Sequence, residues 1–378
     1  MLKFELLKIY REKTIYILSA LLALVIFTPF LLGHSQFDYI QYYESNFKEN
    51  NKTIENIKND PTATETVSDI KEVNGYLGEL IASIKNENSK KMLDSELKYE
   101  HKNLEDMEAG KLNAGSLIDQ KTKVAVLHYL TTHGIEKISE NSKDLGSVNY
   151  LSLLISMPQF VLVLLILISF HIAYIFNLDY RKNNFIIYNN SPKTYLKLFF
   201  VKFFANILAI LLNIIGVFVL VLSIVGIKNG LGNTRYPIAT IQNNSEVSII
   251  STSNFVFKVL FFLFLFCIFL GLIGLFLSIL SSNLLLSISV LILPLVLGQY
   301  DLLNTFINHN LKPFIILSYI DISHIIVGGS GFQPITNPTI TFNNGLLLLL
   351  FSISICLILL LIILIKFPKR LIYNKFPK

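Results

Sequence analysis

Six long apolar runs alternate with polar segments along the 378-residue chain. Most of the runs reach the length of roughly 20 residues that a helix needs to cross a bilayer. A backbone inside lipid must bond its own polar groups, so runs of this kind predict helices. We therefore expect an all-α polytopic membrane protein with six transmembrane helices, at Thr14–Leu32, Asn149–Asn177, Leu198–Ile227, Phe255–Ser281, Leu284–Gln299 and Gly345–Ile365.

Three of the six expected spans contain a proline, and those in the second and fifth spans change the expected shape. Pro158 is expected to kink the second span, because a proline inside a helix removes one hydrogen bond and crowds the preceding turn. The fifth span is short and contains Pro294, which leaves open whether it is tilted, broken or incomplete.

A polar segment, 33–148, lies between the first two expected spans and has the pattern of a helical domain. Apolar residues recur there at steps of three and four, which is the period of an amphipathic helix. The two stripes are Val67, Ile70, Val73, Leu77, Leu80 and Ile84, then Leu93, Leu97, Leu104 and Met107. Pro61 and Ser116, the latter with Asp119 three residues on, are typical of helix starts. The pattern does not distinguish a substrate-binding surface from a passive cap.

Two smaller segments are also expected to be helical. Residues 1–13 combine an apolar stripe of Leu2, Leu6 and Ile9 with cationic side chains, which predicts an amphipathic cytoplasmic segment on the membrane surface. A plain basic flank to the first span is the alternative. Residues 300–344 are interrupted by prolines and never reach spanning length, so short surface or re-entrant helices are expected there.

Charge predicts the orientation. Of 26 acidic residues, 20 lie in Gln36–Val148. The segments 1–13, 178–202, 281–283 and 366–378 together carry 14 basic and three acidic residues. Positive charge beside spans stays cytoplasmic, so we expect both termini inside the plasma membrane, a basic cytoplasmic tail at 366–378 and an extracellular domain at 33–148. Because the basic residues flank spans, the net charge of +6 does not indicate nucleic-acid binding.

The sequence gives little indication of a catalytic or metal site. It has no P-loop and no HExxH, so no catalytic residue, metal or cofactor is expected. Cys267 and Cys356 lie in apolar runs and are interpreted as core residues. Gly328–Gly331 has the GxSG pattern of intramembrane serine proteases, but no histidine follows His324, which favours a flexible turn.

A few polar residues fall within or at the rims of the expected spans, at His171, Asn206, Asn213 and Gln299. Such residues commonly form hydrogen bonds between membrane helices. The alternative is that they line a translocation path.

The segment Asn177–Phe204 reads NLDYRKNNFIIYNNSPKTYLKLFFVKFF. It resembles the segment between the second and third spans of ATP-binding-cassette type-2 permeases. Asp179 stands where that family usually has Glu, Ser191–Pro192 matches its Ser-Pro pair, and Lys202 matches the Lys that opens the third span. Asn183–Asn184 replaces the usual Gly-Thr. The order of amphipathic segment, first span, outer domain and further spans is also similar.

The resemblance implies a permease subunit of an exporter, working as two copies with a separate cytoplasmic ATPase that binds ATP and Mg. The ATPase would dock on a coupling loop, 178–198, whose implied docking residues are Asp179, Asn183, Asn184, Ile187, Tyr188, Ser191 and Pro192. The large outer domain is similar to that of Gram-positive peptide or antibiotic exporters. An amphipathic or hydrophobic cargo such as a peptide, toxin or antibiotic is therefore expected, reached from the membrane lipids. The alternative is a non-transporting membrane sensor or assembly scaffold whose extracellular domain binds a ligand.

Overall fold

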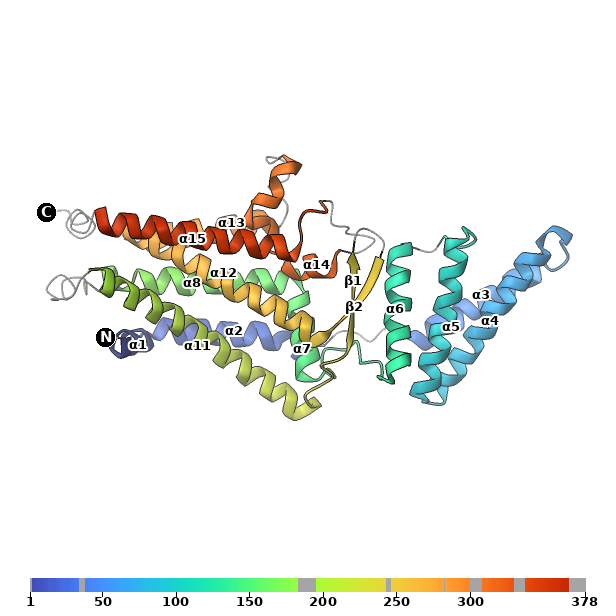
Figure 1. Cartoon of the computed structure of the whole chain (residues 1–378). Coiled ribbons are helices and arrows are strands. Elements are labelled where there is room, and N and C mark those ends of the chain that lie inside the picture. The colour runs from blue at the N-terminus through green and yellow to red at the C-terminus, as the bar shows by residue number, and fades with distance from the viewer. Residues whose placement is uncertain are drawn as a thin grey trace.

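The computed structural model describes residues 2–33, 38–113, 115–182, 195–242, 246–281, 283–299, 308–329 and 337–366. The described residues form an elongated body (Figure 1). An apolar helix bundle occupies one end, and a domain of helices α3–α6, within residues 38–135, occupies the other. A small β-hairpin lies between the two parts.

Five helices of the described chain are long and apolar enough to cross a membrane. They are α2 (Lys13–Leu32), α8 (Pro158–Phe176), α11 (Tyr195–Asn229), α12 (Thr252–Leu280) and α15 (Phe342–Lys366). The expected fifth span forms α13 (Leu284–Gln299), a 16-residue helix with Pro294 inside it. The chain is thus a mostly helical protein with the apolar helices of a multi-pass membrane protein.

The expected second span is not one continuous helix. It divides into α7 (Ser147–Ser156) and α8, with Met157 in extended conformation between them. Pro158 takes the first position of α8, where its missing N–H costs no hydrogen bond, and it disfavours helical geometry at the residue before it. The break is therefore a local consequence of Pro158.

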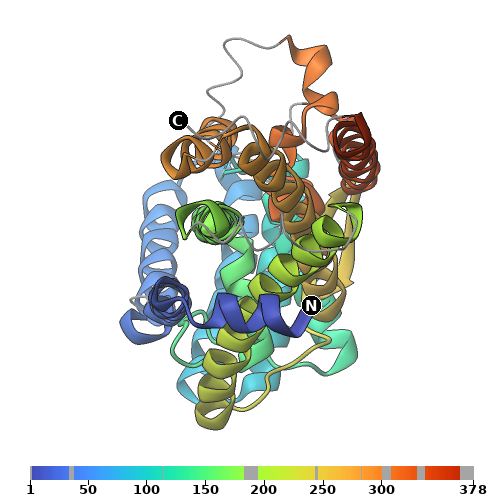
Figure 2. The ribbon, with the colours of Figure 1, turned by 90° about the vertical axis from the view of Figure 1, so that its left-hand side faces the viewer.

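Helices α8 and α12 form the centre of the bundle. About two thirds of the most apolar stretch of each is buried, at 67% and 61%, against 17–28% for α2, α11 and α15. Figure 2 looks along the bundle and shows α1 (Leu2–Tyr10) lying across its end. The outer faces of α2, α11 and α15 stay apolar and exposed, as expected of helix surfaces that face lipid.

The N-terminal stripe predicted from the sequence is only partly correct. Helix α1 buries Ile9 and Glu5 and packs Leu6 against the core of the bundle, whereas Leu2 is 43% exposed. The buried face of α1 contacts α11. Glu5 lies on this face, where its carboxylate pairs with Lys8. The sequence prediction considered only the apolar residues of this segment, so it did not place Glu5 on the buried face.

The α3–α6 domain is helical, as its pattern predicted. It contains α3 (Tyr39–Ile57), a 3-10 turn (η1, Pro61–Ala63), α4 (Thr64–Lys85), α5 (Ser89–Glu108) and α6 (Leu117–His133). The predicted stripe on α4 supplies the core residues Leu77 and Leu80, which pack with Tyr43 and Tyr99. Ser116 caps α6 by accepting a hydrogen bond from the Asp119 N–H, as predicted.

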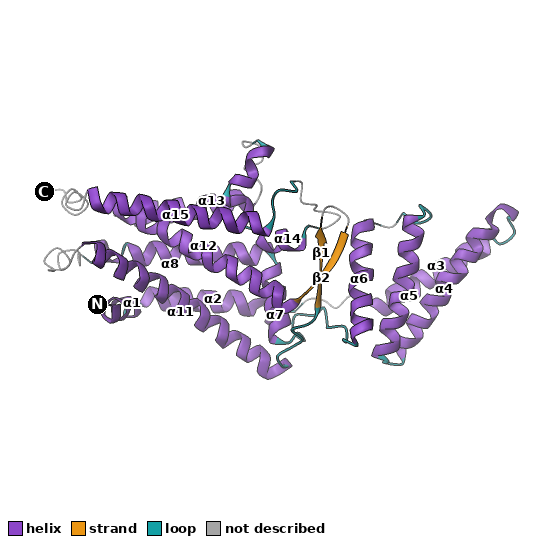
Figure 3. Cartoon of the chain, viewed as in Figure 1, coloured by secondary structure: helices purple, strands orange, loops and turns teal. Residues whose placement is uncertain are grey.

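A two-stranded antiparallel sheet follows α11, and the all-α prediction did not include it (Figure 3). Strand β1 (Pro237–Gln242) pairs with β2 (Glu246–Ser251), with Pro237 opposite Ser251. The hairpin contacts α6 on one side and α14 (Ile322–Val327) on the other. It therefore connects the α3–α6 domain to the bundle.

A backbone contact beside the hairpin makes a second connection. The N–H groups of Ser147 and Val148 donate to the carbonyl oxygens of Gly230 and Leu231. A Cβ atom on Gly146 would lie 2.4 Å from the backbone of Gly232, so only glycine allows the two segments to approach this closely. The start of α7 is thereby fixed to the end of α11.

The segment before α15 contains short helices, as predicted for 300–344. The described part forms the 3-10 helices η3 (His309–Phe314) and η4 (Ile316–Tyr319), followed by α14. Gly328, in left-handed conformation, ends α14 beside β1, where a Cβ atom would meet the carbonyl oxygen of Ile241 at 2.1 Å.

Candidate functional site

A cluster of buried charges lies where α8 ends, at the end of the bundle away from the α3–α6 domain. Helix α8 is followed directly by the short helix α9 (Leu178–Arg181), which carries Asp179. Asp179 Oδ1 accepts a hydrogen bond from Lys8 Nζ at 2.8 Å, and Asp179 Oδ2 accepts one from Lys202 Nζ. One carboxylate therefore joins α1, α9 and α11.

The cluster is electrically balanced. Lys8 also pairs with Glu5, whose side chain is only 2% exposed, so two carboxylates face two ammonium groups. Burial on its own would raise the pKa of Asp179, but the attraction of Lys202 and Lys8 outweighs it and holds the pKa below its ordinary value. Asp179 is therefore ionised near neutral pH.

A second set of contacts connects the α1–α2 junction to α8 and α9. Glu12 pairs with Lys182, and the Tyr174 hydroxyl donates to Glu12 Oε2 at 3.1 Å. The Arg181 guanidinium lies 3.8 Å from the centre of the Tyr174 ring, in cation–π geometry. Both sets of contacts thus surround α9, the element that leads into residues 183–194.

Most of the expected docking residues lie outside the part of the chain that the structure describes. These are Asn183, Asn184, Ile187, Tyr188, Ser191 and Pro192. Asp179 is described, and Lys202, which the family resemblance singled out, is its direct partner.

Another contact at the same end joins α8 to α13. The Asn177 side chain is fully buried and donates to Ser287 Oγ at 3.1 Å. Sequence reasoning did not identify Asn177, Ser287, Lys8 or Glu12. The ion pairs of Glu5 and Glu12 could have been anticipated from the sequence, because an acidic residue buried among apolar residues requires a cationic partner.

A chain of polar side chains crosses three helices farther inside the bundle. His171 Nε2 on α8 lies 2.9 Å from Asn213 Nδ2 on α11, and Ser19 Oγ on α2 donates to Asn213 Oδ1 at 2.6 Å. His171 Nδ1 lies 2.9 Å from the Leu167 carbonyl oxygen. A neutral imidazole that donates through Nδ1 and accepts through Nε2 satisfies both contacts.

Two of the four predicted polar residues therefore meet, together with Ser19, which was not predicted. Their contacts are the hydrogen bonds between helices that the first interpretation expected. Asn206 is buried on α11, two turns before Asn213. Gln299 is the last residue of α13 and lies ~18 Å along that helix from Ser287, which contacts Asn177. His171 lies ~9 Å along α8 from Asn177. A path-lining role for the four stays a prediction.

Within the described ranges, no group of histidine, cysteine and acidic residues is arranged to hold a metal ion. The search against protein-family models found no match, nor did the searches against curated proteins and solved structures.

Proposed function

We propose that this protein is the membrane-spanning permease subunit of an ATP-binding-cassette exporter of the type-2 class. In this proposal α2, α7–α8, α11, α12, α13 and α15 are the six spans, and both termini are cytoplasmic. The α3–α6 domain then lies outside the cell. Two copies would form the pathway, and a separate ATPase would bind residues 183–194.

The observation that carries the proposal is the shared carboxylate of Asp179. It binds Lys8 of α1 and Lys202 of α11 at the residue that leads into the proposed docking segment. Separating either lysine from Asp179 would break an ion pair at a poorly solvated site, which is costly. A force applied to 183–194 would therefore move α1, α8 and α11 together, as transmission from an ATPase requires.

The placement of α1 and the end of α15 supports the same orientation. Both lie at the end of the bundle that carries Asp179, opposite the α3–α6 domain (Figure 1). The basic residues Lys8, Lys182 and Lys202 lie at that end, which the positive-inside rule assigns to the cytoplasm.

An amphipathic cargo suits the apolar bundle. The helices α2, α8, α11, α12 and α15 contain no carboxylate in their described residues. Lys197, Lys202, Lys228 and Lys258 lie toward the ends of α11 and α12, and the neutral His171–Asn213 contact lies farther inside. A hydrophobic or amphipathic molecule entering from lipid would find few fixed charges to repel it. We infer a peptide, toxin or antibiotic of this character.

A membrane sensor is the second candidate. The hairpin contacts both α6 and α14, and the Gly146–Gly232 contact holds α7 to α11. Ligand binding on the α3–α6 domain would be felt by the bundle through these contacts. A sensor of this kind needs no ATPase.

Co-purification separates the two candidates. The full chain is isolated from its native membrane in mild detergent, and bound proteins are identified by mass spectrometry. The permease proposal expects a stoichiometric partner with a P-loop and ATPase activity, and its absence favours the sensor.

Thiol labelling tests the orientation. With Cys267 and Cys356 replaced by alanine, Ser89→Cys should react with an impermeant maleimide in intact cells. Asn374→Cys should react only after permeabilisation. Labelling of Asn374→Cys from outside would refute the six-span topology.

A further inference from the structure

A groove of about 730 Å³ opens on the surface of the α3–α6 domain. All four helices line it, together with η1 and the segment after α5. This volume falls in the range of ligand pockets, which are ~300–1,000 Å³. The contacts described above for the bundle do not involve it.

Apolar and aromatic side chains form one part of the lining. Ile70 and Val73 come from α4, Tyr99 and Met107 from α5, and Tyr42 from α3. Tyr99 is held in place by an edge-on contact with the ring of Tyr43, at 5.9 Å between ring centres. These residues give the groove a preformed surface for apolar side chains.

Acidic residues form the other part. The lining contains the carboxylates Glu49, Glu65, Asp69, Glu100 and Asp106 but only two lysines, Lys111 and Lys123. Glu100 is 4% exposed and is satisfied inside the domain by Lys123 and Gln120. Asp106 pairs with Lys102 beside the groove, so the excess negative charge comes from Glu49, Glu65 and Asp69, which lie nearer the solvent.

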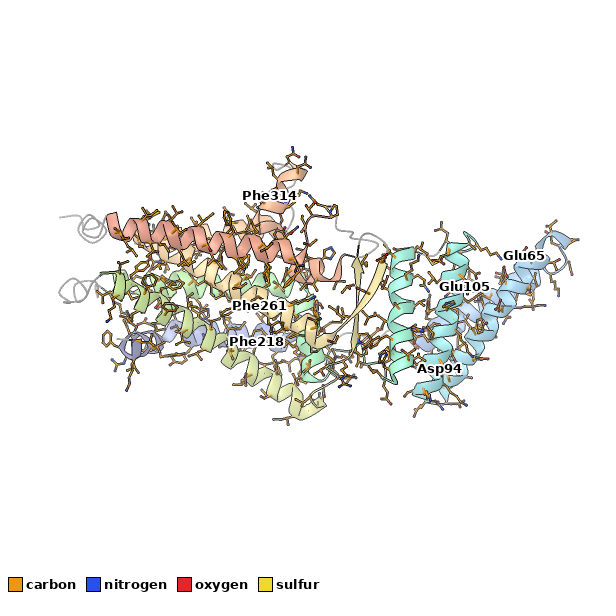
Figure 4. The ribbon with its side chains drawn as sticks, in the orientation of Figure 1. Glu65, Asp94, Glu105, Phe218, Phe261 and Phe314 are labelled. Atoms are coloured by element: carbon orange, nitrogen blue, oxygen red, sulfur yellow. The ribbon has the colours of Figure 1, made fainter. Side chains whose placement is uncertain are left out.

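Lys111 shows how the groove holds a cation. Its ammonium group lies 2.8 Å from Asp69 Oδ2 and 3.1 Å from Glu65 Oε1. The hydrogen bond from Lys111 lowers the pKa of Asp69, so this carboxylate stays ionised. Lys111 comes from the connection after α5, beside Gly110, whereas both carboxylates belong to α4. Figure 4 labels Glu65, which lies at the start of α4.

We propose that this groove binds a basic amphipathic peptide, and that a cationic side chain of the peptide takes the place of Lys111 between Glu65 and Asp69. Apolar side chains of the peptide lie on Tyr42, Tyr99 and Val73. An arginine is the favoured side chain because its planar guanidinium donates to two carboxylates at once.

Removing Lys111 should strengthen peptide binding, whereas removing the carboxylates should weaken it. Lys111 competes with the peptide, so Lys111→Ala frees Glu65 and Asp69 and should tighten binding by about threefold, as expected for one exposed ion pair. Glu65→Gln with Asp69→Asn removes the acceptors and should weaken binding by about tenfold.

Matched controls lie on the same domain. Lys121 on α6 pairs with Glu108 and does not line the groove, so Lys121→Ala changes the net charge identically. Glu105 on α5, labelled in Figure 4, is outside the lining, and Glu105→Gln with Glu79→Gln matches the double acidic variant.

The test uses the full chain in nanodiscs and a fluorescent 12-residue peptide of arginine, leucine and isoleucine, with its glutamine-for-arginine version as a second probe. Anisotropy gives Kd at low and high salt. We expect the arginine peptide to bind and the glutamine version not to bind, and high salt should raise the Kd of the arginine peptide. Lys111→Ala should lower this Kd, and the double acidic variant should raise it.

Equal effects of Lys111→Ala and Lys121→Ala would overturn the proposal, as would tight binding of the glutamine peptide. A binding assay on purified protein needs no ATPase, so its failure is distinct from failure of the permease proposal. The biological reading of the groove as a cargo or peptide-recognition surface rests on the proposed outside location of the α3–α6 domain.

Discussion

Lys8 Nζ lies 2.8 Å from Asp179 Oδ1, although 171 positions separate the two residues along the chain. Lys202 contacts the other oxygen of the same carboxylate. The side chains of Asp179 and Lys8 are 13% and 14% exposed, so water replaces neither partner well. The contact fixes α1 to the start of α11 through a residue that belongs to neither.

Replacing Asp179 by asparagine should destabilise the protein. Asp179→Asn keeps the shape of the side chain but leaves Lys8 and Lys202 without their shared carboxylate, and we expect a loss of about 2 kcal/mol. Thermal unfolding in detergent measures it. Lys197→Gln, at an exposed position of α11, serves as the control and should leave the midpoint unchanged.

The same ion pairs should make stability depend on pH in the acidic range. The pKa of folded Asp179 lies below its unfolded value, so its contribution is complete above the unfolded pKa and is lost as pH falls through the folded pKa. The difference in unfolding midpoint between wild type and Asp179→Asn should be constant from pH 7 to about 5 and shrink below about pH 4. A difference that grows on acidification would contradict the assignment.

The His171–Asn213–Ser19 chain should respond unequally to truncation. Asn213→Ala leaves His171 Nε2 without its contact and should cost about 1 kcal/mol, the usual scale of a hydrogen bond between membrane helices. Ser19→Ala should cost less, because the Ser19 hydroxyl also reaches the Ile15 carbonyl oxygen and has only one hydrogen to donate. Equal losses would mean that the two residues act as one unit. A change in exported cargo would instead favour the path-lining interpretation.

The contact between α7 and α11 should tolerate no side chain. Gly146→Ala places a Cβ atom 2.4 Å from the backbone of Gly232, so we expect a loss of about 2 kcal/mol or more. Gly75→Ala is the matched control. Gly75 is exposed inside α4 with nothing within 4 Å of an added Cβ, so alanine should stabilise there by up to about 1 kcal/mol. Opposite shifts of the two unfolding midpoints are the expected result.

The apolar pattern of the sequence predicted the helices well because the hydrophobicity of side chains and their helical spacing can be recognised within a short stretch of sequence. Leu77 and Leu80 recur at helical spacing and form the core that the spacing implies. The Ser116 cap was also predictable, since it depends on a residue only three positions away. Pro158 was expected to kink the second span, and in the structure the helix is interrupted there, between α7 and α8.

The remaining features depend on partners that are far apart in sequence. The pairing of Lys8 with Asp179 requires α1 to cross the bundle end beside α11, which no local pattern encodes. Strands β1 and β2 are short and half-buried and lie between two long apolar runs, so the sequence analysis did not predict them, although Ala239–Gln242 alternates apolar and polar residues as a strand does. Ser19 was missed because a lone serine in a span usually bonds to its own helix.

Capture of an ATPase by residues 183–194 tests the central claim most directly. Ile187→Asp and Tyr188→Asp place a charge in the proposed apolar contact, which is costly when the charge stays unpaired. Asn374→Asp adds the same charge in the basic tail and is the control. Each variant is expressed in its native membrane and purified, and the ATPase recovered per copy of the chain is quantified. The account predicts full recovery with wild type and Asn374→Asp and recovery reduced by about tenfold or more with the other two. Undiminished recovery in both Ile187→Asp and Tyr188→Asp, at normal expression, would contradict it.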